Sequence, residues 1–351
     1  MKKIITVLLV VALLFSMAAC AGTGAKNDKF VGISMPTQDL QRWNQDGANM
    51  KEKFEAAGFK VDLQYANNEV ATQVSQIENM ISAGVKVLVI AAIDGKTLTS
   101  VLASAKTAGI YVIAYDRLIM DTDAVSYYCT FDNYMVGTIQ GQYIKDQLKL
   151  DDGGKYNIEI TAGDPADNNA LYFYQGAIDV LQPYIDSGVL TVVSKQVKFE
   201  EVATPAWSTE TSQARMEAIL ASFYADGTQL DACLCSNDST AKGVTNALAS
   251  SYTGKYPIVT GQDCDIVNTK DIIAGKQSMS IFKDTRTLAA QTVTMVSDIL
   301  AGKTPETNDT KSYDNGTGII PTFLCAPVFA DINNYKALLI DSGYYTADQL
   351  K

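Results

Sequence analysis

The sequence contains no histidine among its 351 residues, and it contains only two tryptophans. Histidine is the commonest general base at neutral pH and the commonest zinc ligand, so its absence excludes the usual form of two kinds of active site. The chain also lacks the phosphate-binding pattern Gly-x-x-x-x-Gly-Lys-Ser/Thr and the nucleophile elbow Gly-x-Ser-x-Gly. We therefore expect neither ATP binding nor a serine nucleophile, and no cofactor.

An excess of positive charge is missing too, because the formal net charge is −11 at pH 7. A protein that binds DNA or RNA normally presents a basic face, so this balance argues against a nucleic-acid partner. Apolar residues make up 47% of the chain and charged residues 19%, which is typical of a globular protein. A chain of this length exceeds the usual size of one domain, which favours two lobes.

Cysteine is scarce, and beyond Cys20 the count of five is odd, so at least one thiol must be unpaired if the chain is exported. These residues are Cys129, Cys233, Cys235, Cys264 and Cys325. No further thiolate or imidazole accompanies the alternating pair Cys233 and Cys235, so we predict buried free thiols rather than metal ligands. The acidic residues between Asn308 and Asp314 lack the spacing of a calcium loop, and no metal site is predicted.

The N-terminus has the organisation of a targeting segment. Lys2 and Lys3 precede an apolar run from Ile4 to Phe15, which is too short to span a bilayer comfortably. Met17-Ala18-Ala19-Cys20 then resembles a bacterial lipobox, so residues 1–20 are predicted to be a signal peptide with Cys20 as the lipidated residue. Plain secretion with cleavage near Ala19 is the alternative. Residues 21–28 would form a flexible tether, and the protein would be exported and lipid-anchored on the outer face of the bacterial cell membrane, or periplasmic.

From Phe30 onward, short apolar runs alternate with helical patterns. Strands are predicted at 30–35, 60–65, 85–90 and 110–115, with helices at 41–57, 69–82 and 98–108 between them. After a strand at 126–131 the cycle resumes, with helices at 134–148, 169–181, 210–224, 239–250 and 284–300 and strands at 156–162, 190–197, 230–235, 257–261 and 278–282. A polar stretch after Lys303, two short apolar runs and a last helix close the chain. The alternation predicts an α/β protein with two doubly wound parallel-sheet lobes.

Polar side chains follow the predicted strands at their carboxyl ends, where open α/β sheets bind ligands. Asp116 and Arg117 directly follow the buried run that ends at Tyr115. The same position in other repeats holds Arg42, Trp43, the segment 167–169, Trp207, Asn237, Asp238, Gln262, Asp263 and Lys283. Carboxylate, amide and guanidinium groups can each bridge neighbouring hydroxyls, and indole faces cover the C–H patches of a pyranose. The set therefore favours a polyhydroxylated ligand.

Each of these residues also has an ordinary structural role open to it. Asn169 and Asp238 are placed where helix N-caps occur, and either tryptophan could be a core residue. Asp263 could be a turn residue. The joint placement of all of them at strand ends is what favours a binding site.

Several segments, taken in order, resemble the xylose-binding and multiple-monosaccharide-binding periplasmic receptors that serve ABC importers. They are Gln41-Arg42-Trp43, residues 76–80, 114–117, 131–133, 167–169 and 236–238, and Gly261-Gln262-Asp263. The similarity runs from about Phe30 to the C-terminus. It implies the fold of a periplasmic binding protein of type I, with two lobes, a three-segment hinge and a monosaccharide in the cleft between the lobes.

The resemblance also assigns roles to individual positions. By position, Trp43 and Trp207 resemble the two rings that sandwich the sugar. Hydroxyls and ring oxygen would be bonded by Arg42, Asp116, Arg117, Asn169, Asn237, Asp263 and Lys283. The N-terminal lobe is expected to comprise residues 29–132 and 284–316, and the C-terminal lobe residues 133–283 and 317–351. The chain should cross between them near Asp132-Asn133, near Lys283-Asp284 and in the polar stretch before Ile319.

The predicted function is that of a monomeric substrate-binding lipoprotein. It would bind an aldopentose or aldohexose, such as xylose, glucose, galactose or arabinose, by hinge closure and deliver it to an ABC transporter permease with its separate ATPase subunit. Three basic residues of the proposed site outnumber the acids Asp116 and Asp263, which leaves acidic sugars open as well as neutral ones.

Three other functions are consistent with parts of the sequence. A sugar-sensing receptor for a membrane kinase or chemoreceptor would need the same site, and the sequence does not separate it from an import receptor. A transcriptional regulator of the same fold would need an N-terminal DNA-binding motif, where this chain has a signal peptide. A secreted sugar-acting enzyme could use Asp116 and Asp263, but the basic residues expected beside them keep a carboxylate ionised and unsuited to act as an acid. We therefore predict that the protein is not an enzyme.

Overall fold

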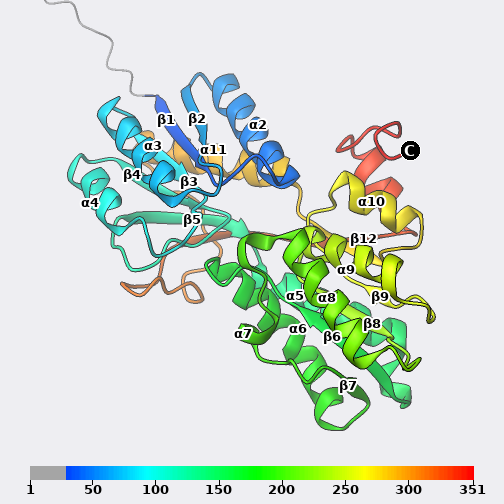
Figure 1. The fold of residues 1–351 in the computed structure, drawn as a ribbon. Coiled ribbons are helices and arrows are strands. Elements are labelled where there is room, and N and C mark those ends of the chain that lie inside the picture. The colour runs from blue at the N-terminus through cyan, green and yellow to red at the C-terminus, as the bar shows by residue number, and fades with distance from the viewer. Residues whose placement is uncertain (1–28) are drawn as a thin grey trace, which may run out of the picture.

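The computed structural model describes residues 29–351, which form two α/β lobes side by side (Figure 1). The signal peptide, Cys20 and the tether predicted for residues 1–28 lie outside the described residues. Within 29–351, no helix combines the length and apolarity that a membrane crossing requires. The five cysteines of this part of the chain are buried and unpaired, which confirms the prediction of free thiols.

The first lobe is built on a six-stranded sheet in the order β11-β5-β4-β3-β1-β2, in which every neighbouring pair is parallel. Its strands are β1 (Phe30–Met35), β2 (Lys60–Tyr65), β3 (Val87–Ile90), β4 (Tyr111–Tyr115), β5 (Val125–Phe131) and β11 (Thr322–Cys325). Because β1 lies between β2 and β3, the chain reverses its direction of winding beside β1. The carboxyl end of β1 is therefore a topological switch point, where a ligand crevice forms.

Successive residues of a strand point to opposite faces of this sheet, and apolar residues occur on both faces. Helices therefore cover both faces. α2 (Gln41–Ala56) and α11 (Thr285–Leu300) pack on the side of Val87 and Val89. α3 (Val70–Ser82) and α4 (Thr99–Thr107) pack on the side of Leu88 and Ile90. A strand that is buried on both faces reads as a continuous apolar run, as observed for β3 and β4.

The second lobe contains a four-stranded parallel sheet in the order β7-β6-β8-β9. Its strands are β6 (Tyr156–Thr161), β7 (Leu190–Val192), β8 (Ala232–Cys235) and β9 (Ile258–Val259), and its helices are α5 (Asn133–Leu148), α6 (Asn168–Asp186), α8 (Thr209–Phe223), α9 (Asp238–Ser251) and α10 (Ile266–Ile273). A short helix α7 (Phe199–Val202) and a 3-10 turn (Pro205–Trp207) lie between β7 and α8, a stretch for which no element was predicted.

One part of the second lobe departs from the predicted parallel arrangement. β10 (Met279–Phe282) pairs antiparallel with β12 (Val328–Asp331). The ribbon continues the four-stranded sheet, because Ser278 N donates to Val259 O at 2.9 Å and Gln262 forms a parallel bridge with Ile281. The two strands are far apart in sequence, so their direction could not be inferred from local pattern.

The chain passes between the lobes after β5, after β10 and after β11. The third passage differs from the expectation of a crossing before Ile319. Residues of that polar stretch bond to the first lobe, since the Asn315 amide donates to the carbonyls of Ile119 and Thr122 at 3.1 and 2.8 Å. β11 then pairs with β5, so the expected boundary after residue 316 has to move to residues 326–327. Polarity in this stretch reflects a solvent-facing turn rather than a hinge.

Candidate functional site

A small polar cavity lies between the lobes. All nine residues predicted as sugar contacts line it: Arg42, Trp43, Asp116, Arg117, Asn169, Trp207, Asn237, Asp263 and Lys283. Leu40, Asp167, Phe173, Ser239, Gln262 and Asp265 complete the wall. The residues come from both lobes, because strand ends of the two sheets face one another across the cleft.

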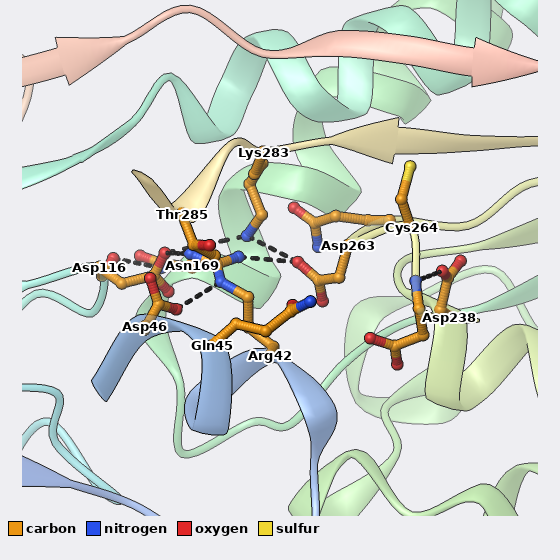
Figure 2. Close-up of polar contacts among 12 residues, drawn as sticks. Arg42, Gln45, Asp46, Asp116, Asn169, Asp238, Asp263, Cys264, Lys283 and Thr285 are labelled. Carbon is orange, nitrogen blue, oxygen red and sulfur yellow. Dashed lines mark hydrogen bonds and ion pairs between the residues drawn. The ribbon is translucent and has the colours of Figure 1, made fainter. Parts of the chain in front are cut away.

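Arg42 pairs with three carboxylates. It lies in the first turn of α2, and its guanidinium donates to Asp46 Oδ2 at 2.5 Å, to Asp116 Oδ2 at 2.7 Å and to Asp263 Oδ1 at 2.8 Å. Figure 2 shows the Arg42 side chain between Asp116 and Asp46 on one side and Asp263 on the other. Since Asp116 follows β4 and Asp263 belongs to the second lobe, this one side chain joins the lobes.

Lys283 reinforces the same cluster from the end of β10. Its ammonium lies 3.2 Å from Asp263 Oδ1 and 3.8 Å from Asp116 Oδ2 (Figure 2). The lysine is buried, with 3% of its surface exposed. A buried ammonium needs such carboxylate partners, because an unpaired charge at this depth is costly.

Asp116 is held in an unusual backbone conformation. Its φ is 59°, in the left-handed region that non-glycine residues seldom adopt. The strain is offset by three hydrogen bonds to its carbonyl oxygen, from the Tyr128 hydroxyl at 2.6 Å, the Thr130 hydroxyl at 2.8 Å and the Asn169 amide at 2.6 Å. Asn169 comes from the second lobe, so its amide is another link between the lobes.

Arg117 forms an ion pair that the sequence did not indicate. Its Nε lies 2.9 Å from Asp167 Oδ2, and its Nη1 donates to the Ala92 carbonyl at 3.0 Å. The guanidinium also stands over the Trp43 ring, 4.9 Å from its centroid. Asp167 was recognised as part of a strand-end segment without an individual role. It caps α6 by accepting from Asn169 N at 3.0 Å while pairing with Arg117.

Trp207 lies on the floor of the cavity because Gly163 leaves room for it. A Cβ added at Gly163 would stand 1.9 Å from the indole ring. Ala206 and Trp207 both have positive φ values of 54° and 55°, which turns the indole toward Phe173, at 6.3 Å between centroids. Both tryptophans are buried and pack in hydrophobic clusters, so each contributes to a core and to the cavity wall.

Asn169 and Asp238, which could have been helix N-caps, are not the capping residues; neighbouring residues cap the two helices. Asn237, not Asp238, caps α9 by accepting from Thr240 N at 2.9 Å. Asp238 accepts from Gln277, Ser280 and the Asp265 backbone, each at 2.8 Å. Through its bond to the Asp265 backbone, Asp238 holds the segment that contains Asp263 in place.

The pKa values of the cavity residues follow from burial opposed by pairing. Burial alone would raise the pKa of Asp116, but Arg42, Lys283 and Arg117 outweigh it and lower that pKa below its usual value. Burial alone would lower the pKa of Arg42, but its three carboxylates raise it well above its usual value. Asp46, which is fully buried beneath Arg42, has a pKa raised by burial to about 6.

Some polar atoms of the cavity wall have no hydrogen-bond partner within the protein. Among the described residues these include Trp207 Nε1, Gln262 Oε1 and Asp265 Oδ1, all of them buried. Buried polar atoms are almost always paired in native proteins, so orphans gathered on one cavity indicate a polar ligand. In residues 29–351, no group of three or more Cys, Asp or Glu side chains is arranged to hold a metal ion.

Comparison with known proteins agrees with this geometry. Residues 31–304 match the family model described as periplasmic binding protein domain. The chain belongs to the periplasmic binding proteins. A multiple sugar-binding periplasmic receptor of Rhizobium radiobacter is 49% identical over 356 residues, covering 100% of both chains. The D-xylose-binding periplasmic protein of Escherichia coli K12 is 35% identical over 349 residues and 99% of each chain.

Solved structures of transporter solute-binding proteins have the same fold. An ABC transporter solute-binding protein from Clostridium phytofermentans with bound β-D-glucose superposes with a TM-score of 0.91 at 68% identity, covering 92% of this chain and 100% of that one. A carbohydrate transporter solute-binding protein from Chloroflexus aurantiacus, in complex with D-glucose, gives a TM-score of 0.83 at 35% identity, covering 91% and 97%. The predicted family and the two-lobe α/β fold class are therefore confirmed.

Gly163 offers a direct test of how Trp207 is positioned. We expect Gly163→Ala to displace the indole, because the new methyl group would overlap the ring, and to make Trp207 more accessible to water. In a Trp43→Phe background Trp207 is the only remaining tryptophan, so the displacement should appear as a red shift of emission. Ser251→Ala, at an exposed residue of the same lobe, serves as the control. An unchanged spectrum in the folded Gly163→Ala variant would contradict the packing described.

Proposed function

We propose that this periplasmic binding protein is the sugar receptor of an ABC importer and holds an aldopentose or aldohexose in the cleft between its lobes. The observation that carries the proposal is that all nine sequence-predicted contact residues line one cavity whose wall contains unpartnered polar atoms. The sugar-binding relatives and the glucose-bound structures support the same ligand class.

The chemistry of the wall suits a monosaccharide. Trp43 and Trp207 provide apolar faces for the C–H patches of a pyranose, since both rings line the cavity. Carboxylates and guanidinium groups around them provide charge-assisted, geometrically fixed hydrogen bonds to hydroxyls. A site that combines stacking with bidentate polar groups recognises a ring by its hydroxyl pattern.

Charge balance favours a neutral sugar over an acidic one. The three cations of the wall face four carboxylates, those of Asp116, Asp167, Asp263 and Asp265. Asp46 adds a fifth carboxylate beneath Arg42. A sugar acid would place a further negative charge among these groups, which is unfavourable in a buried site. The sequence assigned more basic than acidic residues to the site. In the structure, further acids that the sequence did not assign to the site offset this positive charge.

Hinge closure is the mechanism that we infer. Arg42 and Asp116 of one lobe bond to Asp263 and Asn169 of the other, so these contacts exist only when the lobes meet. A sugar that bonds both lobes binds the closed form more tightly and shifts the population toward it. The closed form would then be the one that a permease recognises. Binding rather than catalysis is also supported by Asp116, whose lowered pKa makes it a poor general acid.

The proposal includes export of the protein, with Cys20 as the residue that carries the lipid anchor. The protein would act as a monomer and deliver the sugar to a membrane permease whose ATPase subunit is separate. Two of the relatives described above are periplasmic proteins, and one of the similar structures is a solute-binding protein of an ABC transporter. A sensor function for a membrane kinase or chemoreceptor would use the same closed form.

A thermal-shift screen of residues 29–351 against neutral and acidic monosaccharides tests the ligand class. We expect a concentration-dependent rise of the melting temperature with one or more neutral aldoses, because a ligand that binds only the native state stabilises it. Isothermal titration of the best sugars then gives affinities. A rise with sugar acids alone would contradict the charge argument, and no rise with any sugar would refute the proposal.

Trp207→Ala should weaken sugar binding by about 1–3 kcal/mol through lost stacking area, while the fold survives. Calorimetric titration with the best sugar of the screen measures the loss. The melting temperature without sugar should fall, because the buried indole also packs in a core cluster, but unfolding should remain cooperative. Equal affinity in a folded Trp207→Ala variant would remove this residue from the site.

Asp116→Asn should weaken binding about 10- to 100-fold, because it removes a charged hydrogen-bond acceptor. Asp132→Asn is the matched control, since Asp132 caps α5 outside the cavity and asparagine caps helices equally well. The two variants are compared in the same titration. A larger loss for Asp132→Asn would overturn the assignment of Asp116.

A further inference from the structure

Asp265 lines the cavity, but neither the strand-end pattern nor the family resemblance selected it. It occupies the N-cap position of α10, where aspartate normally accepts a hydrogen bond from a backbone N–H. Asp132, Asp167 and Asp284 occupy the same position in α5, α6 and α11, and each of them accepts such a bond. Asp265 accepts none. Its carboxylate is therefore available for another partner.

The free carboxylate oxygen is buried rather than hydrated. Asp265 Oδ1 has no hydrogen-bond partner in the protein. Leaving a buried acceptor unsatisfied destabilises a protein, and it does so more strongly when the group is charged. Because Asp265 is one of the residues that line the cavity, a hydroxyl of a ligand bound there is the donor that would satisfy this oxygen.

The backbone around Asp265 is fixed from both lobes. Its N–H donates to Asp238 Oδ2 at 2.8 Å, and Asp238 is itself held by Gln277 and Ser280. The next N–H, that of Ile266, donates to Gln41 Oε1 at 3.1 Å, and Gln41 is the first residue of α2. Asp265 is thus oriented by the second lobe and connected to the first lobe when the cleft is closed.

We propose that Asp265 is a further sugar-binding residue, in which Oδ1 accepts a hydrogen bond from one hydroxyl of the bound monosaccharide and so contributes to sugar selectivity. This inference rests on the proposed function. It adds a contact on the wall of the second lobe beside Asp263.

The electrostatic surroundings give this contact a pH dependence. Burial, and then the charge of Asp263, raise the pKa of Asp265 to about 7, and Arg42 opposes them. The charge of Asp265 in turn raises the pKa of three neighbouring groups, those of Asp238 in α9, Cys264 in the same loop and Tyr345 in the C-terminal segment. A hydroxyl donated to Oδ1 favours the ionised carboxylate, so sugar binding lowers its pKa and releases a proton. Affinity should then rise as the pH rises through about 7.

The test is isothermal titration of residues 29–351 with D-glucose, D-xylose and the monodeoxyglucoses, at about pH 5.5, 7 and 8.5, for the parent and Asp265→Asn. We expect Asp265→Asn to weaken D-glucose binding about 10-fold or more near pH 8.5 and to flatten the pH dependence. One monodeoxyglucose, which lacks the bonded hydroxyl, should lose little further affinity in the variant. Asp271→Asn, on the same helix but paired with Lys242 outside the cavity, is the matched control and should bind like the parent.

The outcomes separate this inference from the function on which it rests. If the parent binds no monosaccharide, both fail. If the parent binds sugar but Asp265→Asn has the same affinity and pH profile, only the Asp265 contact is refuted. An equal loss for every deoxy sugar would refute it too, because a merely structural effect does not depend on a single hydroxyl. Melting temperatures without sugar show that the variants are folded.

Discussion

The arrangement of the cleft depends on the buried guanidinium of Arg42. It bonds three carboxylates, from its own helix, from the end of β4 and from the second lobe. A buried charge destabilises the protein unless its hydrogen-bond donors are paired. The buried guanidinium therefore requires the three carboxylates at these positions. The contact between Arg42 and Asp263 brings residues 221 positions apart in sequence together, and it forms only when the lobes approach. Under the proposed hinge closure, the lobes would therefore close and the site would assemble in the same step.

Strained backbone accompanies this arrangement at several positions of the cavity wall. Asp116, Trp207 and Asp263 have φ values of 59°, 55° and 99°. Such conformations persist only where the surroundings over-determine them, as the three donors to the Asp116 carbonyl do. A ligand that bonds these residues meets groups that are already oriented, so little side-chain freedom is lost on binding.

Acidic groups behind the wall modify the charge of the site. Asp46 lies beneath Arg42, and Asp238 holds the segment from Asp263 to Asp265. Of these two, Asp46 pairs with Arg42 and so offsets part of the basic charge that is most obvious in the sequence. For the proposed ligand, a neutral monosaccharide, the acids of the wall would provide acceptors for the hydroxyls.

The sequence by itself determined the alternation of strands and helices, and with it the positions of the cavity residues. Asp116 and Arg117 end an apolar strand, and parallel strands bring their carboxyl ends to one edge, so local pattern was enough to place them. Hydrophobic periodicity is local, and most predicted elements match the observed ones closely for that reason. β7 is an exception, since it ends at Val192 although the strand was predicted to continue to Val197.

Only the tertiary structure decided which residues pair across the chain. It placed β11 beside β5, made β10 and β12 antiparallel, joined Arg117 to Asp167 and left Asp265, at the N-terminus of α10, without a capping hydrogen bond in the lining of the cavity. Each of these depends on hydrogen bonds or ion pairs between segments distant in sequence. No local pattern encodes them, because the same residue can cap a helix, turn a loop or bind a ligand according to what the fold brings against it.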